Sequence, residues 1–596
     1  MPVIAQAAAD GEGGIPWLTL TTFGPVLGIL ALMFIPREQV EALRNVALLT
    51  TLGVFVVSLG IMINFNPGIA AAAGEAFTFQ MTESLEWIPA LGIEYYIGID
   101  GFSIWLVMMT TFLMPIAVWS TYSAVDKYVK EYMICLLFLQ VGMVGALVAL
   151  DVFLFYIFWE VMLIPMYLII GIWGGKERVK AAIKFFLYTM LGSVLMLVAI
   201  VYVYLTAADQ TGIYSFAYSH LLGVELSYTE QFWLFGAFAL AFAIKVPLFP
   251  FHTWLPLAHV QAPTAGSVIL AAVMLKLGTY GLIRYAFPMF PDALIVYAPY
   301  IAALAVIGII YGAVVALIQP DVKKLVAYSS VSHLGFCVLG LVAMTPQGLA
   351  GGMYVMLAHG IATGGLFLCV GVLYERRHSK QIADFGGVAK VMPVFAAFFA
   401  IIMLGSAGLP GLNGFVGEFL SLMGASKSHF LSFGEYQFFM PSAEGGSEVA
   451  GLTALSARSM GPELTAFVFT IFATTGVVLG AAYLLWMFKR VMFGPVKDEK
   501  VSKMPRLSGR EIGVLLPIVA MVIFMGVYPK FFLSYMDPSM EQYLGYMDEQ
   551  VSLAVEAAEA DPEREPIYGS VVVERLHPDW VPEGSMWDRA MERADE

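Results

Sequence analysis

The stretch from Val152 to Trp173 reads VFLFYIFWEVMLIPMYLIIGIW, and Glu160 is its only ionisable residue apart from two tyrosines. A helix needs about 20 predominantly apolar residues to cross the hydrocarbon core of a bilayer. This stretch therefore predicts a membrane-spanning helix with a carboxyl group near its middle. A charge at that depth is costly, which points to a function or to a partner of opposite charge.

The rest of the chain repeats this apolar pattern. Of its 596 residues, 59% are hydrophobic and 13% are charged, and the mean hydropathy is +0.80. A soluble domain carries roughly 25% charged residues. We therefore expect an all-α integral membrane protein with about fourteen transmembrane helices. The expected spans are 17–36, 46–65, 102–122, 132–150, 152–173, 181–206, 231–257, 264–287, 297–319, 322–344, 348–374, 391–423, 464–488 and 512–532.

Positive charge predicts the orientation of these spans, because Lys and Arg concentrate in cytoplasmic loops. Here they follow the odd-numbered spans, for example at Arg37, Lys127, Lys176, Arg376 and Lys489. The loops after even-numbered spans are almost free of them, apart from Lys427 and Arg458 in one long loop. We expect both termini in the periplasm and the chain in the inner (plasma) membrane of a bacterial cell.

The formal net charge of −14 comes mostly from the end of the chain, where fifteen Asp and Glu residues accompany four Lys and Arg from Glu541 onward. Nucleic acid is therefore not an expected partner. The three cysteines are far apart, without a C-x-x-C pattern or a Cys/His cluster for zinc or an iron–sulfur centre. Neither a G-x-G-x-x-G nor a complete phosphate loop is present. We expect no metal and no cofactor bound to this chain.

A few of the predicted spans contain an ionisable side chain near mid-depth, and five of these side chains are the candidate functional residues. They are Glu160, Lys245, Lys276, His333 and Glu418. A charged residue at the helix centre costs about 2.5–3.5 kcal/mol on insertion scales, so four of them cost on the order of 10 kcal/mol. Burial also makes such groups switchable, because it disfavours the charged form. Proton or cation transfer along these residues is the predicted function.

Each candidate also has a structural interpretation, which the sequence leaves open. Glu160 and Lys245 could form a buried ion pair that fixes the helix register. His333 could be a hydrogen-bonded core histidine. Lys323, near a cytoplasmic helix end, is expected to snorkel towards water, as are Lys184 and Lys324. Lys276 is the hardest to explain structurally, because it is central and has no partner within its own span.

Two of the predicted spans are interrupted. Pro247 and Pro250 follow Lys245, and the run Gly408, Pro410 and Gly411 precedes Glu418. Proline breaks a helix, and irregular backbone at membrane depth is tolerated only where it is buried in protein or lines a wet cavity.

The interrupted spans are five apart, so spans four to eight and nine to thirteen are predicted to form two inverted repeats, each with a broken helix. Two unrelated kinks are the alternative. The resulting division is 1–130 for helices one to three, 131–290 and 297–492 for the repeats, 493–537 for the last helix, and 538–596 for an acidic extramembrane tail.

Four motifs in order resemble a known family. They are FWEVMLIPMY at 158–167, FHTWLPLAHVQAPTAGS at 251–267, DVKKLVAYSSVSHLG at 321–335 and LPGLNGFVGEF at 409–419. Together they resemble the antiporter-like, proton-pumping subunits of respiratory complex I, NADH:quinone oxidoreductase, over roughly residues 46–528. Glu418 stands where the subunit M branch (chain 4 in mitochondria) has glutamate and subunits L and N have lysine. The loop 424–462 and the tail from Pro538 are longer than expected, and the sequence leaves open whether they bind neighbouring subunits or are solvated.

The resemblance implies a role for each candidate. Glu160 would modulate the charge of Lys245, which would exchange a proton through Lys276 and water with His333, and Glu418 would end the path. Residues that could support proton uptake are Lys323, His252 and His259. NAD, FMN, iron–sulfur clusters and quinone would belong to partner subunits, which include the antiporter-like subunits L and N. The alternatives are a subunit of a multisubunit Na⁺/H⁺ antiporter, of a membrane-bound hydrogenase, or a scaffold.

Overall fold

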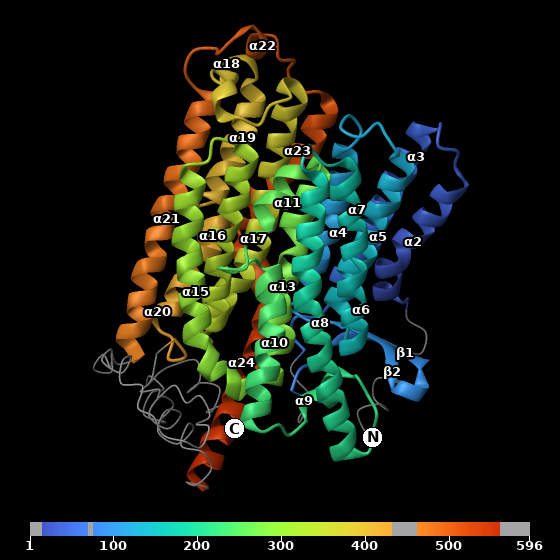
Figure 1. The fold of residues 1–596 in the computed structure, drawn as a ribbon, viewed down its shortest axis with the longest axis vertical. Coiled ribbons are helices and arrows are strands. Elements are labelled where there is room, and N and C mark those ends of the chain that lie inside the picture. Colours follow the sequence, from blue (N-terminus) through green and yellow to red (C-terminus); the bar gives the residue numbers. More distant parts are fainter. Residues whose placement is uncertain (1–14, 70–75, 432–461, 561–596) are drawn as a thin grey trace.

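A computed structural model describes residues 15–69, 76–431 and 462–560, and these form a bundle of upright helices (Figure 1). The first helices are α2 (Trp17–Phe34), α3 (Val40–Asn64), α4 (Ile104–Ser120), α5 (Val129–Val148), α6 (Val152–Val161), α7 (Leu163–Trp173), α8 (Arg178–Thr211) and α9 (Tyr218–Leu222). A β-hairpin of β1 (Gln80–Ile88), the 3₁₀ turn η1 (Pro89–Leu91) and β2 (Ile93–Ile99) lies between α3 and α4. Its strands pair antiparallel, with Ser84 opposite Tyr96.

The middle of the chain contains the first interrupted helix. The elements are α10 (Tyr228–Lys245), α11 (Leu255–Gln261), α12 (Thr264–Ile269), the π-helical segment η2 (Leu270–Met274), α13 (Lys276–Gly281), the π-helical segment η3 (Leu282–Ala286), α14 (Phe287–Met289), α15 (Pro291–Leu317), α16 (Val322–Val342) and α17 (Pro346–Arg377). The segment 264–289 is thus one long helix, widened on either side of α13.

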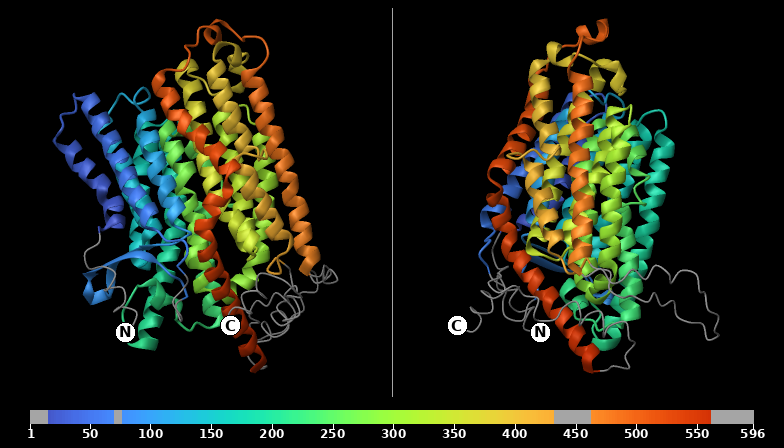
Figure 2. Two further views of the ribbon diagram at one scale, coloured as in Figure 1. Left: turned by 180° about the vertical axis from the view of Figure 1, so that it is seen from behind. Right: turned by 90° about the vertical axis from the view of Figure 1, so that its left-hand side faces the viewer.

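The remaining elements include the second interrupted helix. They are η4 (Ile382–Asp384), α18 (Val388–Val391), α19 (Pro393–Ser406), α20 (Asn413–Ser426), α21 (Pro462–Met492), α22 (Glu499–Ser502), α23 (Gly509–Val527) and α24 (Pro529–Ala560). Figure 2 shows α23 and α24 following one another along one side of the bundle. Residue 538, where the extramembrane tail was predicted to begin, lies inside α24, and the division into domains stays a prediction.

The chain is a multi-pass integral membrane protein. In the described part, eleven helices are long and apolar enough to cross a bilayer, and α4 and α19 are shorter apolar helices. Each of the fourteen predicted spans coincides with one or more of the described helices, while the count itself stays a prediction. The interruptions occur as predicted, between α10 and α11 and between α19 and α20. Most of the long loop 424–462, and the tail beyond Ala560, lie outside the described residues.

Local sequence explains the helix starts and breaks. Asp151 and Asp321 cap α6 and α16 by accepting the backbone N–H groups of Leu154 and Lys324. At the first break, the indole N–H of Trp254 donates to the carbonyl of Ile244, which satisfies a group that the prolines leave unpaired. At the second break, Gly408 and Gly411 adopt φ values of +74° and +87°, which favour glycine.

Candidate functional site

Lys245 ends α10 immediately before the first break and is fully buried. Within the described residues its ammonium has no hydrogen-bond partner, and it lies 4.7 Å from the centroid of the Trp159 ring. Glu160, the next residue on α6, forms no salt bridge with Lys245 in the part of the chain that the structure describes, and its Oε1 atom is also unpaired. The two opposite charges are therefore neighbours without direct contact. This arrangement is therefore not the closed ion pair that the structural interpretation of Glu160 and Lys245 predicts.

Lys276 begins α13, between the two π-helical segments, and is buried. Its Nζ atom donates to the carbonyl of Ala271 at 2.6 Å and contacts Nδ1 of His359 at 2.6 Å. An ammonium group can only donate, so its charged form requires His359 to accept at Nδ1. With a neutral amine, the imidazole can donate instead. The contact can therefore hold a proton on either partner.

His359 reaches Lys276 because α17 approaches the helix of Lys276 closely. A Cβ atom added to Gly360 would lie 3.0 Å from the carbonyl oxygen of Ala272 and 2.3 Å from the sulfur of Met109. A larger residue at 360 would push the two helices apart. Glycine in the helix interior costs stability, and here it brings the imidazole and the ammonium together.

His333 on α16 continues the line from His359. The centroids of these two rings are 6.0 Å apart. Nδ1 of His333 contacts Oε1 of Glu418 at 2.7 Å, and Nε2 contacts the hydroxyl of Tyr483 on α21 at 2.9 Å. Glu418 lies on α20, one turn after the second break, and is buried. Four titratable side chains from four helices thus follow one another from Lys276 to Glu418.

The three possible uptake residues lie beside the breaks and the loops. His252, between α10 and α11, contacts the rings of Phe249 and Tyr311. His259, on α11, stacks on Phe367 with ring centroids 4.6 Å apart. Both nitrogens of His259, and Nδ1 of His252, lack a partner within the described residues.

Lys323 does not snorkel, which corrects the expectation from its position near a helix end. Its side chain is buried, with 4% of the residue exposed, and Nζ donates to the carbonyl of Ala262 at 2.5 Å. Ala262 ends the short helix that carries His259. Lys380, in the loop after α17, donates to the carbonyl of Val260 on the same helix. Burial lowers the pKa of Lys380, although the nearby carboxylate of Asp321 opposes that shift.

Sequence reasoning missed three groups of functional interest. His359 lies in a glycine-rich run, and its role as a bridge between Lys276 and His333 depends on tertiary packing. Tyr483 is one of 28 tyrosines, and its sequence context gives no sign that it contacts His333. A signal for His359 was nevertheless present in the sequence. His359 is the one histidine of the predicted span 348–374, and the same kind of signal identified His333.

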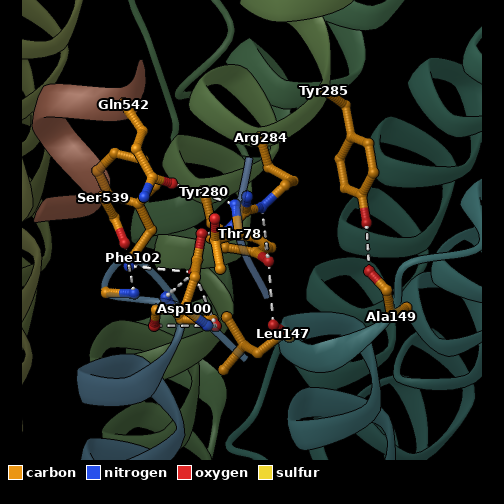
Figure 3. Close-up of polar contacts among 12 residues, drawn as sticks. Thr78, Asp100, Phe102, Leu147, Ala149, Tyr280, Arg284, Tyr285, Ser539 and Gln542 are labelled. Atoms are coloured by element: carbon orange, nitrogen blue, oxygen red, sulfur yellow. Dashed lines mark hydrogen bonds and ion pairs between the residues drawn. The ribbon is translucent and has the colours of Figure 1, made fainter. Parts of the chain in front are cut away.

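The third group is a buried ion pair at the far end of the helix of Lys276 (Figure 3). Nη2 of Arg284 lies 2.5 Å from Oδ2 of Asp100, and the side chains are 2% and 4% exposed. Arg284 also donates to the hydroxyl of Tyr280, which in turn donates to the carbonyl of Leu147. Oδ1 of Asp100 accepts the backbone N–H groups of Phe102 and Ser103. Every side chain in this group has a fixed partner.

Comparison with known proteins places these residues in a family. Residues 149–435 match the family described as "NADH:quinone oxidoreductase/Mrp antiporter, TM". That range includes every candidate from Glu160 to Glu418. Within the described residues, no three His, Cys, Asp or Glu side chains are arranged to hold a metal ion.

Relatives match over nearly their whole length. The NADH-quinone oxidoreductase subunit M of Rhodobacter capsulatus is 44% identical over 88% of this chain and 95% of its own. The NADH-ubiquinone oxidoreductase chain 4 of Arabidopsis thaliana is 41% identical over 87% of this chain and 94% of its own. A chain in the structure of respiratory complex I from Thermus thermophilus with bound NADH superposes with a TM-score of 0.74 at 29% identity, over 89% of this chain and 99% of that one. This chain therefore belongs to the family of NADH-quinone oxidoreductase subunit M, called chain 4 in the NADH-ubiquinone oxidoreductases.

Proposed function

We propose that this chain is the proton-translocating membrane subunit of a respiratory NADH:quinone oxidoreductase (complex I), in which electron transfer takes place in other subunits. One observation carries the proposal. Lys276, His359, His333 and Glu418 form a buried succession in which neighbours either share a hydrogen bond or lie within reach of one water molecule. The near full-length relatives support the assignment to the oxidoreductase.

Proton transfer along the second half of the line follows from these contacts. A proton moves between Lys276 and His359 along a hydrogen bond of 2.6 Å, with little movement of either side chain. His333 and Glu418 exchange a proton in the same way at 2.7 Å. Between the two imidazoles, whose ring centroids are 6.0 Å apart, a water molecule would complete the path. The geometry supports transfer from Lys276 to Glu418, with Glu418 as the terminal group.

Lys245 is the switching residue of the first half. Its ammonium has no fixed partner within the described residues, and its long side chain can change direction. Next to Glu160 it keeps its proton, because the carboxylate stabilises the charge. Directed towards Lys276 it releases the proton, because two like charges in a low-dielectric interior repel. Glu160 thereby controls the charge of Lys245.

Uptake from the cytoplasm uses one route for each half of the chain. His252 serves the first half, beside Lys184, which donates to the carbonyl of Thr253. His259 serves the second half, on the short helix that Lys323 and Lys380 hold in place. The unpaired imidazole nitrogens on both histidines support these roles.

The chain acts within a larger assembly. NAD, FMN, iron–sulfur clusters and quinone bind to partner subunits, and this chain carries out no redox chemistry. The antiporter-like subunits L and N are its neighbours in a bacterial plasma membrane, and both termini face the periplasm. Two inverted repeats, spans four to eight and nine to thirteen, are supported by the two broken helices and by the capping aspartates Asp151 and Asp321, which occupy corresponding positions.

A subunit of an Mrp-type Na⁺/H⁺ antiporter is the second candidate, because the description of the matched family covers both kinds of protein. A buried line of Lys, His and Glu suits either. The two functions differ in their energy source. Translocation that requires NADH oxidation by co-purified flavin and iron–sulfur subunits identifies the oxidoreductase, whereas cation exchange without redox subunits identifies the antiporter.

The decisive experiment replaces Lys245 with Ala and measures NADH-driven proton uptake in inverted membrane vesicles, after assembly of the complex has been verified on native gels. We expect proton uptake to be lost and NADH oxidation to be slowed or uncoupled. Lys503→Ala is the control, because its side chain is 74% exposed and lies outside the proposed proton path, so proton uptake should stay unchanged. Normal uptake by a fully assembled Lys245→Ala complex would reduce Lys245 to a structural residue and refute the mechanism.

A further inference from the structure

Thr363 occupies the turn of α17 that follows His359 and is fully buried. Its hydroxyl has no hydrogen-bond partner within the described residues. This is unusual for a threonine inside a helix of this protein, because such hydroxyls donate to the carbonyl one turn earlier. Examples of that normal arrangement are Thr110, Thr189, Thr206 and Thr470. The Thr363 hydroxyl is therefore free to bind a group other than the carbonyls of its own helix.

The neighbours of Thr363 along the same helix face are two aromatic residues. His359 lies four residues before it and Phe367 four residues after it, which is about 6 Å along the axis in each direction. Phe367 stacks on His259, so the imidazole of His259 lies one turn beyond Thr363. Because side chains lean towards the N-terminus of their helix, the hydroxyl of Thr363 leans towards His359. Thr363 thus stands between two histidines.

Three side chains at this position have unpaired polar atoms. They are Nε2 of His359, Oγ1 of Thr363 and both nitrogens of His259. Buried polar atoms in native proteins are satisfied by protein groups or by ordered water, and a buried water needs two to four polar partners. These donors and acceptors can bind a water molecule and can exchange a proton with it.

We propose that Thr363 is a positioning residue that holds water between His259 and His359, and that this water delivers cytoplasmic protons to Lys276. The proposal rests on the proposed function of the chain and adds the route by which the second half is loaded. A protonated His259 gives its proton to the water, and the water gives one proton to Nε2 of His359. The imidazole then releases its Nδ1 proton to the neutral amine of Lys276, which it already contacts. Charge and atoms balance at each step.

Hydrogen bonds to backbone carbonyls fix both ends of this route. On the cytoplasmic side, Lys323 holds the carbonyl of Ala262, three residues after His259. On the inner side, Lys276 is fixed by the carbonyl of Ala271. The hydroxyl of Thr363 can both donate to and accept from water.

The test compares Thr363→Val with Thr363→Ser in the assembled complex. Valine has the shape of threonine without the hydroxyl, whereas serine keeps the hydroxyl. We expect Thr363→Val to lower NADH-driven proton uptake several-fold and to raise its solvent deuterium isotope effect, because proton loading becomes rate-limiting. Thr363→Ser should restore both quantities. Thr189→Val is the matched control, since the hydroxyl of Thr189 is already bound within its own helix, and both quantities should stay at the wild-type level.

Proton uptake and an isotope effect at the wild-type level in an assembled Thr363→Val complex would overturn this proposal. If that result accompanies loss of uptake in Lys245→Ala, only the role of Thr363 fails and the proposed function stands. If valine prevents assembly, Thr363→Ala takes its place, and proton uptake by the alanine variant should fall below that of the serine variant. Equal uptake by the alanine and serine variants would also contradict the role of the hydroxyl.

Discussion

Arg284 and Lys276 are two buried cations on the same long helix, eight residues apart, and their surroundings differ completely. Arg284 has a carboxylate partner in Asp100, a hydroxyl partner in Tyr280, and three aromatic rings within 5.0–5.7 Å of its guanidinium carbon. Lys276 has a backbone carbonyl and an imidazole, and within the described residues it forms no salt bridge.

Under the proposed function, the difference separates a charge that stabilises the fold from charges that transfer protons. Arginine stays protonated in proteins, so a fully paired Arg284 is a fixed positive charge. Lysine gives up its proton when its surroundings do not stabilise the ammonium, and a histidine neighbour is a natural acceptor. Incomplete pairing therefore distinguishes Lys245 and Lys276 from Arg284 more clearly than burial does, because all three are buried.

The largest expected effect comes from breaking the fixed pair. Asp100→Ala leaves the Arg284 guanidinium buried without its counter-charge, and such a change costs about 3–5 kcal/mol. We expect little assembled complex in the membrane, as measured by native gel electrophoresis and thermal denaturation of detergent extracts. Glu499→Ala is the control, because its partner Lys503 is 74% exposed and exposed pairs contribute about 0–1 kcal/mol. Normal thermal stability of Asp100→Ala would show that the pair does not hold the fold.

For Lys276→Met we expect the reverse of Asp100→Ala: the complex assembles and stays stable, but proton transfer is lost. This change removes a poorly paired buried charge and keeps the apolar stem, so stability should be unchanged or increased. Proton transfer should fall on the order of 100-fold, the typical contribution of a positioned acid–base group. Thermal denaturation and NADH-driven proton uptake on the same preparation measure both quantities. A strongly destabilised Lys276→Met complex would place Lys276 with Arg284 among the structural charges.

A smaller effect is expected at Tyr483. Tyr483→Phe removes the hydroxyl that contacts Nε2 of His333 and keeps the ring. The loss of one such hydrogen bond is worth about 1 kcal/mol, which corresponds to about a five-fold change in rate if the bond stabilises the charged imidazole. Proton uptake should therefore fall by a few-fold at unchanged assembly. No change in uptake would mean that Tyr483 only fills space beside His333.

The sequence was sufficient to predict the transmembrane class and the two interrupted helices. Apolar runs identify the helices, and the proline and glycine clusters around residues 247–250 and 408–411 fix the breaks. The interruption of the fifth span at Met162 was absent from the prediction, although Pro165 cannot donate a hydrogen bond to the carbonyl of Val161, where α6 ends. The π-helical segments beside Lys276 and the β-hairpin between α3 and α4 were also absent from the prediction.

The candidate site was predicted in part, and its limits have a physical reason. Lys276, His333 and Glu418 stand out because titratable groups are rare in apolar runs. His359 and Thr363 gain their significance only from residues on other helices, as does the anchoring of Lys323 by Ala262. A pairwise contact across 60 to 85 positions leaves no periodic trace in one sequence.

The contacts of α24 have a consequence for the synthesis of the chain. The backbone N–H of Gly101 and the indole N–H of Trp105 donate to Ser539 and Phe532, more than 400 positions later. At a translation rate of about 5–20 residues per second, these donors wait about 20–90 s for their acceptors. A ribosome that stops before residue 529 leaves them without partners next to the Asp100–Arg284 pair. Helix α24 thus completes a region that was synthesised more than 400 residues earlier, and a chain that stops before α24 exposes an unfinished surface that quality-control proteases can recognise.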